Sequence, residues 1–182
     1  MGTEEREMLD KARQIIINSL GEQIRLYGIT PSNGRLFGIL YFHEEPMTLD
    51  EMAQEMGMSK TAMSNVARSL IDVKMLDRVW TKGSRKHLYR ARTDFFKNYL
   101  EFVAMQAKAE REIALKDYDK VEPIYEQLLQ SSDDEIKRQA ELDFNKIKED
   151  KKYYYWLERV AKFLENEEII KYVPKEEPNS FK

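Results

Sequence analysis

One stretch of this chain allows few alternatives for its local fold. Residues 47–76 read MTLDEMAQEMGMSKTAMSNVARSLIDVKML. Thr48 and Glu51 have the spacing of a capping box, which predicts that a helix begins there, and Gly57 predicts its end. After a short turn, Ser59 is a suitable N-cap for a second helix. A short helix, a tight glycine turn and a second helix together predict a helix-turn-helix.

The second of these helices divides its residues between two faces. An apolar stripe is formed by Met63, Val66, Leu70 and Val73. The opposite face carries small, hydrogen-bonding or cationic residues, namely Thr61, Ser64, Asn65 and Arg68. Such side chains can contact base edges and phosphates in a DNA major groove. No acidic residue occurs between Lys60 and Ile71, as expected of a surface that meets an anionic groove.

A β-hairpin is predicted directly after this helix. Residues 76–80 alternate between apolar and polar, and residues 88–91 do so more weakly, with a glycine-containing turn between them. The cations Lys82, Arg85 and Lys86 fall at or near the tip. Because cations there can contact phosphates or the minor groove, the hairpin is predicted to be the wing of a winged helix-turn-helix.

The charge distribution supports an anionic partner. Residues 59–92 contain nine Lys and Arg against two Asp, a net charge of +7 within a chain whose total is −3. A compact basic segment in an otherwise acidic chain is typical of a local nucleic-acid contact. The alternative interpretation is an ordinary solvated surface.

Helices are predicted on both sides of this segment. The first is expected over residues 4–27, where apolar residues recur at intervals of three and four, and Gly28 is expected to end it. Ser32 is the predicted N-cap of an apolar, buried helix that ends near His43.

On the C-terminal side, Thr93 is predicted to cap a long helix from residue 94 to at least residue 114. Pro123 is expected to kink or divide the helical segment beyond it. Ser132 and Glu135 have capping-box spacing and predict a final helix that reaches about Tyr172.

The expected fold is therefore mainly α with a small β-hairpin wing. A winged helix-turn-helix DNA-binding domain at residues 29–92 is flanked by an N-terminal dimerisation helix at 1–28 and by C-terminal dimerisation helices at 93–173. Residues 174–182 are expected to form a flexible tail.

Composition argues against several other classes of protein. Without cysteine the chain has no disulfide and no thiolate metal ligand, and two histidines are too few for an ordinary zinc site. Neither a nucleophile–base pair nor a phosphate-binding loop is recognised, so we expect no enzyme, no cofactor and no metal. Since neither a membrane-length apolar run nor a signal peptide is recognised, a cytoplasmic protein without membrane contact is expected.

The segment LYGITPSNGRLFGILYFHEEPMTLDEMAQEMGMSKTAMSNVARSLIDVKMLDRVWTKGSRKHLYRA resembles the GbsR branch of the MarR-type winged helix-turn-helix regulators. The motifs YG-TPS-GRL-G, PMTLDEM, MSKT-MS and KG-RK-LY are specific in combination. The resemblance is strong over residues 26–102 and thin beyond about residue 115.

This resemblance implies a homodimer that binds a double-stranded DNA operator. It implies a repressor of choline or glycine-betaine uptake or synthesis genes, released by a small quaternary-ammonium ligand. The positions that match the recognition helix are Ser59, Lys60, Thr61, Ser64, Asn65 and Arg68, and those that match the wing are Lys82, Arg85 and Lys86.

The resemblance also implies an effector pocket between the winged helix and the dimerisation helices. Aromatic rings hold quaternary-ammonium groups by cation–π attraction. The candidate lining residues are Tyr27, Phe37, Tyr41, Phe42, Phe95, Phe96 and Tyr99. For each of them, ordinary core packing is the alternative, and the pair Phe95-Phe96 differs from the Trp- and Tyr-rich pair expected of a choline cage.

Four aromatics occur in succession in KKYYYWLERV, residues 151–160. At about 100° per residue they point in four directions on a helix, so they cannot enclose one ligand. Tyr153, Tyr154 and Trp156 are expected on a broad apolar face at the dimer interface, while Tyr155 falls on the polar side.

A different class of function stays open on the sequence alone. A winged-helix protein can serve as an architectural or protein-interaction module with a different effector or none. Such a module would not need base-facing Asn and Ser on the second helix.

Overall fold

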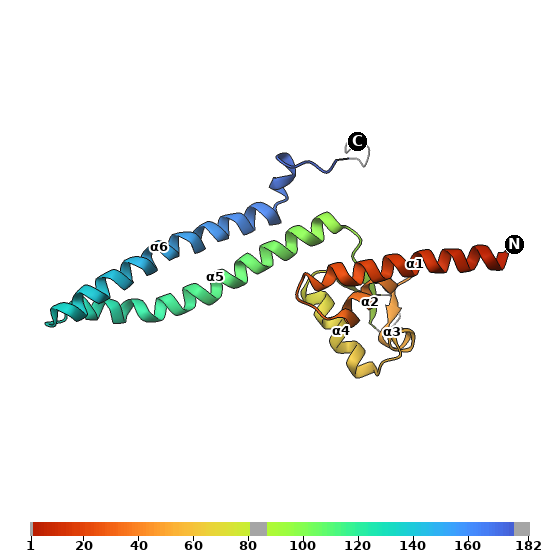
Figure 1. The fold of residues 1–182 in the computed structure, drawn as a ribbon, viewed down its shortest axis with the longest axis horizontal. Coiled ribbons are helices and arrows are strands. Elements are labelled where there is room, and N and C mark those ends of the chain that lie inside the picture. The colour runs from red at the N-terminus through yellow and green to blue at the C-terminus, as the bar shows by residue number, and fades with distance from the viewer. Residues whose placement is uncertain (1, 81–86, 177–182) are drawn as a thin grey trace. The chain divides into compact units, whose positions relative to one another are not determined.

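The computed structural model describes residues 2–80 and 87–176, and it is helical apart from a small sheet (Figure 1). The elements follow in the order α1 (Gly2–Arg25), α2 (Pro31–Tyr41), β1 (Met47–Thr48), α3 (Leu49–Met56), α4 (Lys60–Asp72), β2 (Leu76–Val79), β3 (Leu88–Ala91), α5 (Phe95–Leu128), α6 (Asp134–Glu165) and the 3₁₀ helix η1 (Glu168–Lys171).

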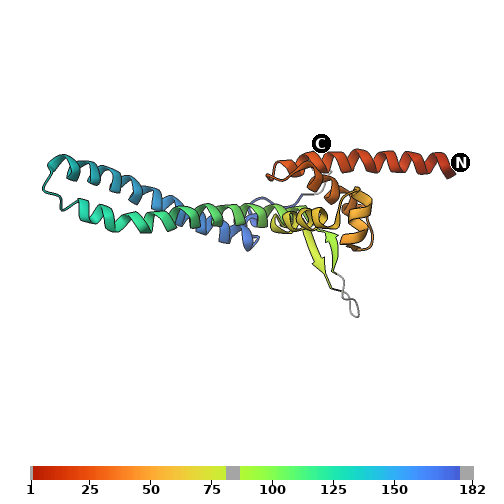
Figure 2. The same cartoon turned by 90° about the horizontal axis from the view of Figure 1, so that it is seen from below.

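The chain divides into two compact units. The winged-helix unit is Met1–Asn98 and contains α1 to α4, the sheet and the first residues of α5. The C-terminal hairpin is Tyr99–Lys182 and contains the rest of α5, α6 and η1. Within the hairpin, α5 and α6 run side by side (Figures 1 and 2).

Glycines allow α1 and α2 to approach backbone to backbone. A Cβ on Gly34 would lie 2.5 Å from Gly21 Cα, and a Cβ on Gly38 would lie 2.9 Å from Ile17 Cα. Neither position has room for a side chain, so glycine at these two sites of α2 sets the separation of the helices. Leu20 and Ile24 of α1 are buried.

Local capping builds the helix-turn-helix as predicted. Thr48 Oγ1 accepts a hydrogen bond from the Glu51 amide at 3.2 Å, and a Glu51 carboxylate oxygen accepts one from the Thr48 amide at 2.6 Å. Gly57 ends α3 with φ of 64°, the left-handed conformation that glycine favours. Ser59 Oγ caps α4 by accepting from the Ala62 amide at 3.2 Å. The predicted capping box, glycine stop and N-cap are all confirmed.

The sheet has the strand order β1-β3-β2, and its pairings are antiparallel. Leu76 lies opposite Ala91 and Val79 opposite Leu88, which confirms the two strands of the predicted hairpin. The sequence interpretation missed β1, because a two-residue strand shows no alternation. The largest fully buried side chains of this unit are Leu36, Phe37, Met52, Met63, Leu70, Met75, Leu76 and Asn98.

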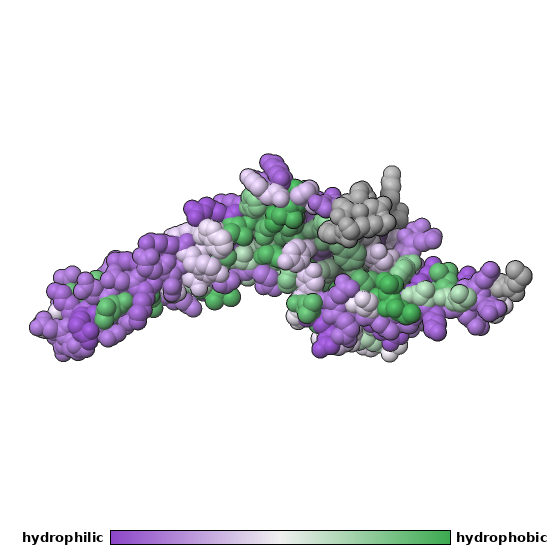
Figure 3. All heavy atoms as spheres, turned by 45° about the horizontal axis from the view of Figure 1, so that its top comes forward, coloured by the Kyte–Doolittle hydropathy of each residue, from purple (hydrophilic) through white to green (hydrophobic). Residues whose placement is uncertain are grey.

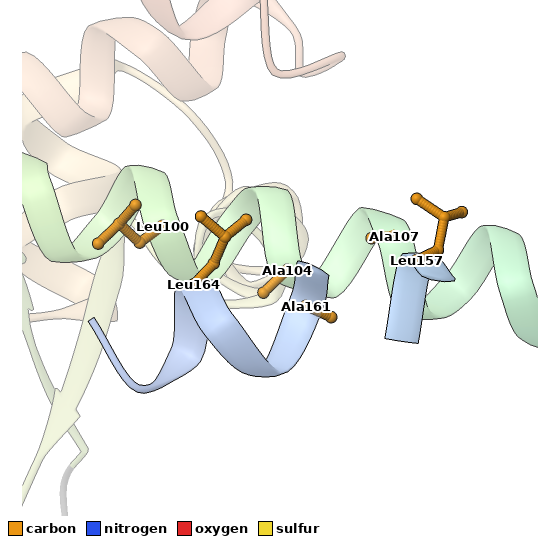
Figure 4. Close-up of a cluster of buried hydrophobic side chains, with 6 residues drawn as sticks. All are labelled: Leu100, Ala104, Ala107, Leu157, Ala161 and Leu164. Atoms are coloured by element: carbon orange, nitrogen blue, oxygen red, sulfur yellow. The ribbon is translucent and has the colours of Figure 1, made fainter. Parts of the chain in front are cut away.

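The C-terminal hairpin has a narrow core of small and medium side chains. From α5 come Leu100, Ala104 and Ala107, and from α6 come Leu157, Ala161 and Leu164 (Figure 4). The alanines let the two helices pack closely, and partly buried residues from α5, α6 and η1 cover the cluster.

Polar contacts join α5 to α6 farther along the hairpin. Lys151 Nζ lies 2.7 Å from Glu122 and 3.1 Å from Asp119, and its side chain is only 12% exposed. The hydrogen bond with Glu122 raises the pKa of Lys151. The Tyr118 hydroxyl donates to Asp150 at 3.2 Å, and burial together with this bond raises the pKa of Tyr118 to about 12.

The four consecutive aromatics take different environments on α6. Tyr154 is half-buried and packs on Tyr118, with ring centroids 5.8 Å apart. Tyr153 and Trp156 stack on each other at 6.0 Å and are each about half exposed, as is Tyr155. Within this chain, the apolar face predicted for Tyr153 and Trp156 is therefore only partly covered.

Several predicted helix ends are wrong. Thr30, not Ser32, is the N-cap of α2, because Pro31 already occupies the first turn. The caps of the long helices are also displaced by one residue, since Asp94 accepts from the Lys97 amide and Asp133 from the Glu135 and Ile136 amides.

The C-terminal boundaries differ as well. Pro123 does not divide α5, which continues through it to Leu128. The final helix ends at Glu165 instead of about Tyr172, because Glu167 is left-handed with φ of 55° and η1 follows. No helix within residues 2–80 and 87–176 is long and apolar enough to cross a membrane.

Candidate nucleic-acid interface

The second helix of the helix-turn-helix, α4, is anchored on one face and open on the other. Met63, Val66, Ala67 and Leu70 are buried in the unit. Thr61, Asn65 and Arg68 are exposed, and Ser64 is half-buried beside them. The apolar stripe thus fixes the orientation of the helix and leaves the predicted base-facing side chains accessible.

The N-terminus of α4 is suited to an anionic partner. The first turn contains no acidic residue. Ser59 has its hydroxyl oxygen engaged as the cap acceptor, so the O–H remains available as a donor. The unpaired amides and the helix dipole place partial positive charge at this end.

Lys60 is the one predicted contact residue of α4 with a described ionic partner. Its Nζ lies 2.8 Å from a carboxylate oxygen of Asp50, which lies on α3, and both side chains are more than half exposed. An exposed pair of this kind contributes little stability, so a phosphate can compete for the Lys60 ammonium.

The structure describes the base of the wing and not its tip. Lys82, Arg85 and Lys86 lie outside the described residues. The two strands project away from the helices of the unit in Figure 2. Where β2 ends and β3 begins, the Arg78 guanidinium lies 5.2 Å from the Trp80 ring centroid, and the centroids of the Trp80 and His87 rings lie 4.8 Å apart. The sequence interpretation did not select Arg78 or Trp80, although a Trp in a strand that alternates was a visible signal.

The predicted ligand-binding aromatics are only partly brought together. Phe37, Tyr41, Phe42 and Phe95 form a chain of ring contacts with centroid separations of 5.0–6.3 Å. Tyr27 is half-buried, whereas Phe96 and Tyr99 are each 56% exposed, and Tyr99 belongs to the C-terminal hairpin. Phe37 has no exposed surface and contributes to the core.

A cavity of about 530 Å³ lies beside this aromatic cluster in the winged-helix unit. Of the seven predicted aromatics, Tyr41 is the one that lines it. Its walls combine this ring with acidic and basic side chains, and the lining residues are Leu40, Tyr41, His43, Glu44, Asp77, Arg90, Ala91, Arg92, Thr93 and Asp94. Arg92 also pairs with Asp77 at 3.7 Å.

Metal coordination gains no support from the described part of the chain. There, no group of three or more His, Asp and Glu side chains is close enough together to hold an ion.

Comparison with known proteins identifies this chain as similar to the GbsR family of transcriptional regulators. A family model, the C-terminal helical hairpin of GbsR family transcriptional regulators, matches residues 95–171, so the likeness extends well beyond residue 115. Similarity to a solved "transcriptional regulator" of 17% identity, with a TM-score of 0.60 over 90% of this chain and 99% of that one, supports the fold.

Two curated relatives come from Bacillus subtilis (strain 168). The chain is 34% identical over 170 residues to the HTH-type transcriptional repressor GbsR, with 92% of this chain and 94% of the relative covered. It is 34% identical over 174 residues to the HTH-type transcriptional repressor OpcR, with 93% and 92% covered. The chain is therefore a DNA-binding transcriptional regulator and not an enzyme, and it belongs to the GbsR family.

Proposed function

We propose that this regulator is a homodimeric repressor that binds an operator through α4 and the wing and is released by a small quaternary-ammonium ligand. The observation that carries the DNA contact is the exposed, acid-free face of α4 above a buried apolar stripe. In a dimer, two such helices can enter successive major grooves, and the bound protein would exclude polymerase from the promoter. The protein would act in the cytoplasm, where its operator is found.

The DNA contact is tested by a gel shift with duplex DNA from upstream of the protein's own gene and from osmoprotectant genes. Arg68→Ala should weaken binding to the specific duplex by roughly 1–3 kcal/mol, and Lys86→Ala should lower the salt slope by about one. Arg138→Ala is the matched control, because Arg138 is an exposed arginine on α6 that pairs with Glu135.

Sequence preference separates a repressor from an architectural module. The repressor should bind its own upstream duplex far more tightly than a scrambled duplex at moderate salt. Equal affinity for every duplex, with equal losses for Arg68→Ala and Lys86→Ala, would contradict the proposal.

Dimerisation is supported by apolar surface that the single chain leaves exposed. On α1, Met8, Leu9, Ile15 and Ile16 are 44–67% exposed, whereas Leu20 and Ile24 of the same helix pack in the unit. Hydrophobic residues also reach the surface of the hairpin (Figure 3), where Tyr153 and Trp156 are about half exposed. Apolar residues that gather on one side of a helix and stay exposed are typical of a surface that binds another chain, so a second copy is the natural occupant.

Analytical ultracentrifugation tests the dimer. Ile15→Glu places a charge in the exposed stripe of α1 and should shift the protein toward monomer at micromolar concentration. Gln14→Glu is the control, because Gln14 is exposed on another side of the same helix. A wild-type protein that stays monomeric would contradict this part of the proposal.

The effector proposal rests on the cavity beside Tyr41. The Tyr41 ring can contact a quaternary ammonium by cation–π attraction, and the carboxylates of Glu44, Asp77 and Asp94 line the same cavity. The guanidinium groups of Arg90 and Arg92 in that lining can bind the carboxylate of a betaine. A ligand would release DNA only if it binds the two states of the protein with different affinity.

Choline and glycine betaine should each be added to the protein–DNA complex in the gel shift. Tyr41→Leu should retain DNA binding and lose the response to the ligand. Tyr125→Leu, which changes a tyrosine in the hairpin, should retain both. If neither compound releases the DNA or raises the melting temperature of the free protein, the effector proposal fails while DNA binding stands.

A further inference from the structure

Trp80 is a large aromatic side chain that the winged-helix unit leaves open. It follows β2 directly and is 69% exposed. An exposed indole leaves a large apolar area in contact with water, which is unfavourable. A residue of this size at the base of the predicted wing therefore suggests a partner.

The register of the sheet explains where the indole lies. Side chains two residues apart on a strand share a face, so Leu76, Arg78 and Trp80 lie on one face of β2. Leu76 pairs with Ala91, and both are buried. The same face thus runs from the core to the open end of the hairpin, where Trp80 lies.

Two neighbours hold the indole without covering it. The Arg78 guanidinium lies 5.2 Å from its ring centroid, and the His87 imidazole packs at 4.8 Å with the rings perpendicular. Within the described part of the chain, His87 Nδ1 is buried without a hydrogen bond. The described contact of the imidazole is the edge-to-face packing on Trp80. We name Arg78, Trp80 and His87 the wing-base bracket.

We propose that the wing-base bracket contacts the deoxyribose–phosphate backbone beside the DNA site of α4. Its indole would pack on a deoxyribose, and its Nε1–H, which has no hydrogen-bond partner among the described residues, would donate to a phosphate oxygen. The Arg78 guanidinium would bind the same backbone. This inference rests on the DNA binding proposed above.

Charge selects DNA over another occupant. The bracket lies within residues 59–92, whose net charge is +7, and Arg78 keeps a cation at the aromatic ring itself. An apolar protein partner would have to desolvate that guanidinium, whereas a phosphate pairs with it. A second copy of the chain would bring a similar positive surface if it met this one through the same segment.

The two tryptophans of the chain allow a direct test. Trp156→Phe leaves Trp80 as the single tryptophan, and Trp80→Phe leaves Trp156. Each full-length variant is titrated with duplex DNA from the protein's own upstream region while tryptophan emission is followed. The emission of the Trp156→Phe protein should change and saturate at the DNA concentration that saturates the gel shift, and the Trp80→Phe protein should change much less.

Affinity gives the second readout. Trp80→Ala should weaken binding about tenfold for specific and scrambled duplexes alike, because a backbone contact carries no base information. Trp80→Phe should recover part of the loss by keeping a ring. Circular dichroism and melting of Trp80→Ala should match the wild type, since the side chain is open.

The outcomes separate the two proposals. Trp80 emission that stays constant while the gel shift saturates would overturn the bracket and leave DNA binding intact. Emission that changes with protein concentration in the absence of DNA would assign the indole to a second copy and also overturn it. The absence of any specific complex in the gel shift would instead reject the proposed function.

Discussion

The winged-helix unit and the C-terminal hairpin bury their apolar side chains to different extents. The largest fully buried side chains all belong to the winged-helix unit. The hairpin cluster contains three leucines and three alanines, and several large aromatics of α6, including Tyr153 and Trp156, stay about half exposed. A closed core can hold α4 in a fixed orientation without help, whereas the narrower core of the hairpin leaves aromatics of its own helix α6 open.

Ion pairs join the two long helices of the hairpin beside its narrow core. Lys108 pairs with Glu165, Arg111 with Glu158 at 3.0 Å, and Lys151 with two carboxylates of α5. These contacts fix the register of α5 against α6. Because exposed pairs contribute little free energy each, they determine alignment more than stability. The two units should therefore respond differently to the same kind of change.

The largest difference is expected when a leucine is truncated in each core. Leu70→Ala in α4 should cost about 3–5 kcal/mol, because the cavity is enclosed on all sides, whereas Leu157→Ala in α6 should cost roughly 2–3 kcal/mol. Leu70 has no exposed surface and Leu157 is 7% exposed. Urea unfolding followed by fluorescence measures both in single-tryptophan backgrounds, with Trp156→Phe leaving Trp80 in the first unit and Trp80→Phe leaving Trp156 in the second.

Equal costs for Leu70→Ala and Leu157→Ala would break the comparison. They would mean that the hairpin core is enclosed as tightly as the other. That result would indicate that a second copy of the chain covers the open face of the hairpin. The cost of Leu157→Ala should then depend on protein concentration.

A smaller effect is expected at the crossing of α1 and α2. Gly34→Ala should cost about 1–3 kcal/mol, because its Cβ would lie 2.5 Å from Gly21 Cα and the helices would have to separate. Gly21→Ala should be neutral or slightly stabilising, since its nearest contact would be 3.6 Å from Gly34 C and alanine favours helix. Thermal unfolding compares the pair, and a tolerated Gly34→Ala would show that the crossing can adjust.

Features that depend on neighbouring residues were predictable from the sequence. Thr48, Glu51, Gly57 and Ser59 act within one or two turns of helix, so their spacing determined where α3 and α4 begin and end. The apolar stripe of α4 likewise determined which face is open. These local rules were sufficient to identify the winged helix-turn-helix.

Features that depend on distant segments were not predictable. Gly34 is essential only because Gly21 lies against it, and β1 exists only because β3 is beside it. Local features were missed too: the caps at Asp94 and Asp133 lie one residue beyond the predicted Thr93 and Ser132, because Thr and Ser are also common cap types. The bracket at Trp80 needed the strand register, which a sequence alone does not supply.

A still smaller effect tests the polar contacts of the hairpin. Lys151→Met should destabilise the hairpin by about 1 kcal/mol, because it leaves Asp119 and Glu122 without their shared cation. The adjacent Lys152→Met should change stability by less than about 0.5 kcal/mol, since its pair with Glu149 is exposed on both sides. Urea unfolding monitored at Trp156 measures the difference.

The smallest effect is expected from pH, and it should be confined to the hairpin. The hydrogen bond with Lys162, together with the charge of Arg111, lowers the pKa of Glu158 from its usual 4.5. A carboxylate with a lowered pKa stabilises the folded state above pH 4.5, and that contribution is lost as pH falls through the lowered value. Glu158→Gln should therefore lower the free energy of unfolding of the hairpin at neutral pH. It should also make the further decrease of that free energy below pH 4.5 less steep, as measured by Trp156 emission. Glu141→Gln, at an exposed position of α6, is the control, and an equal flattening there would show that Arg111 and Lys162 do not bind Glu158 in solution.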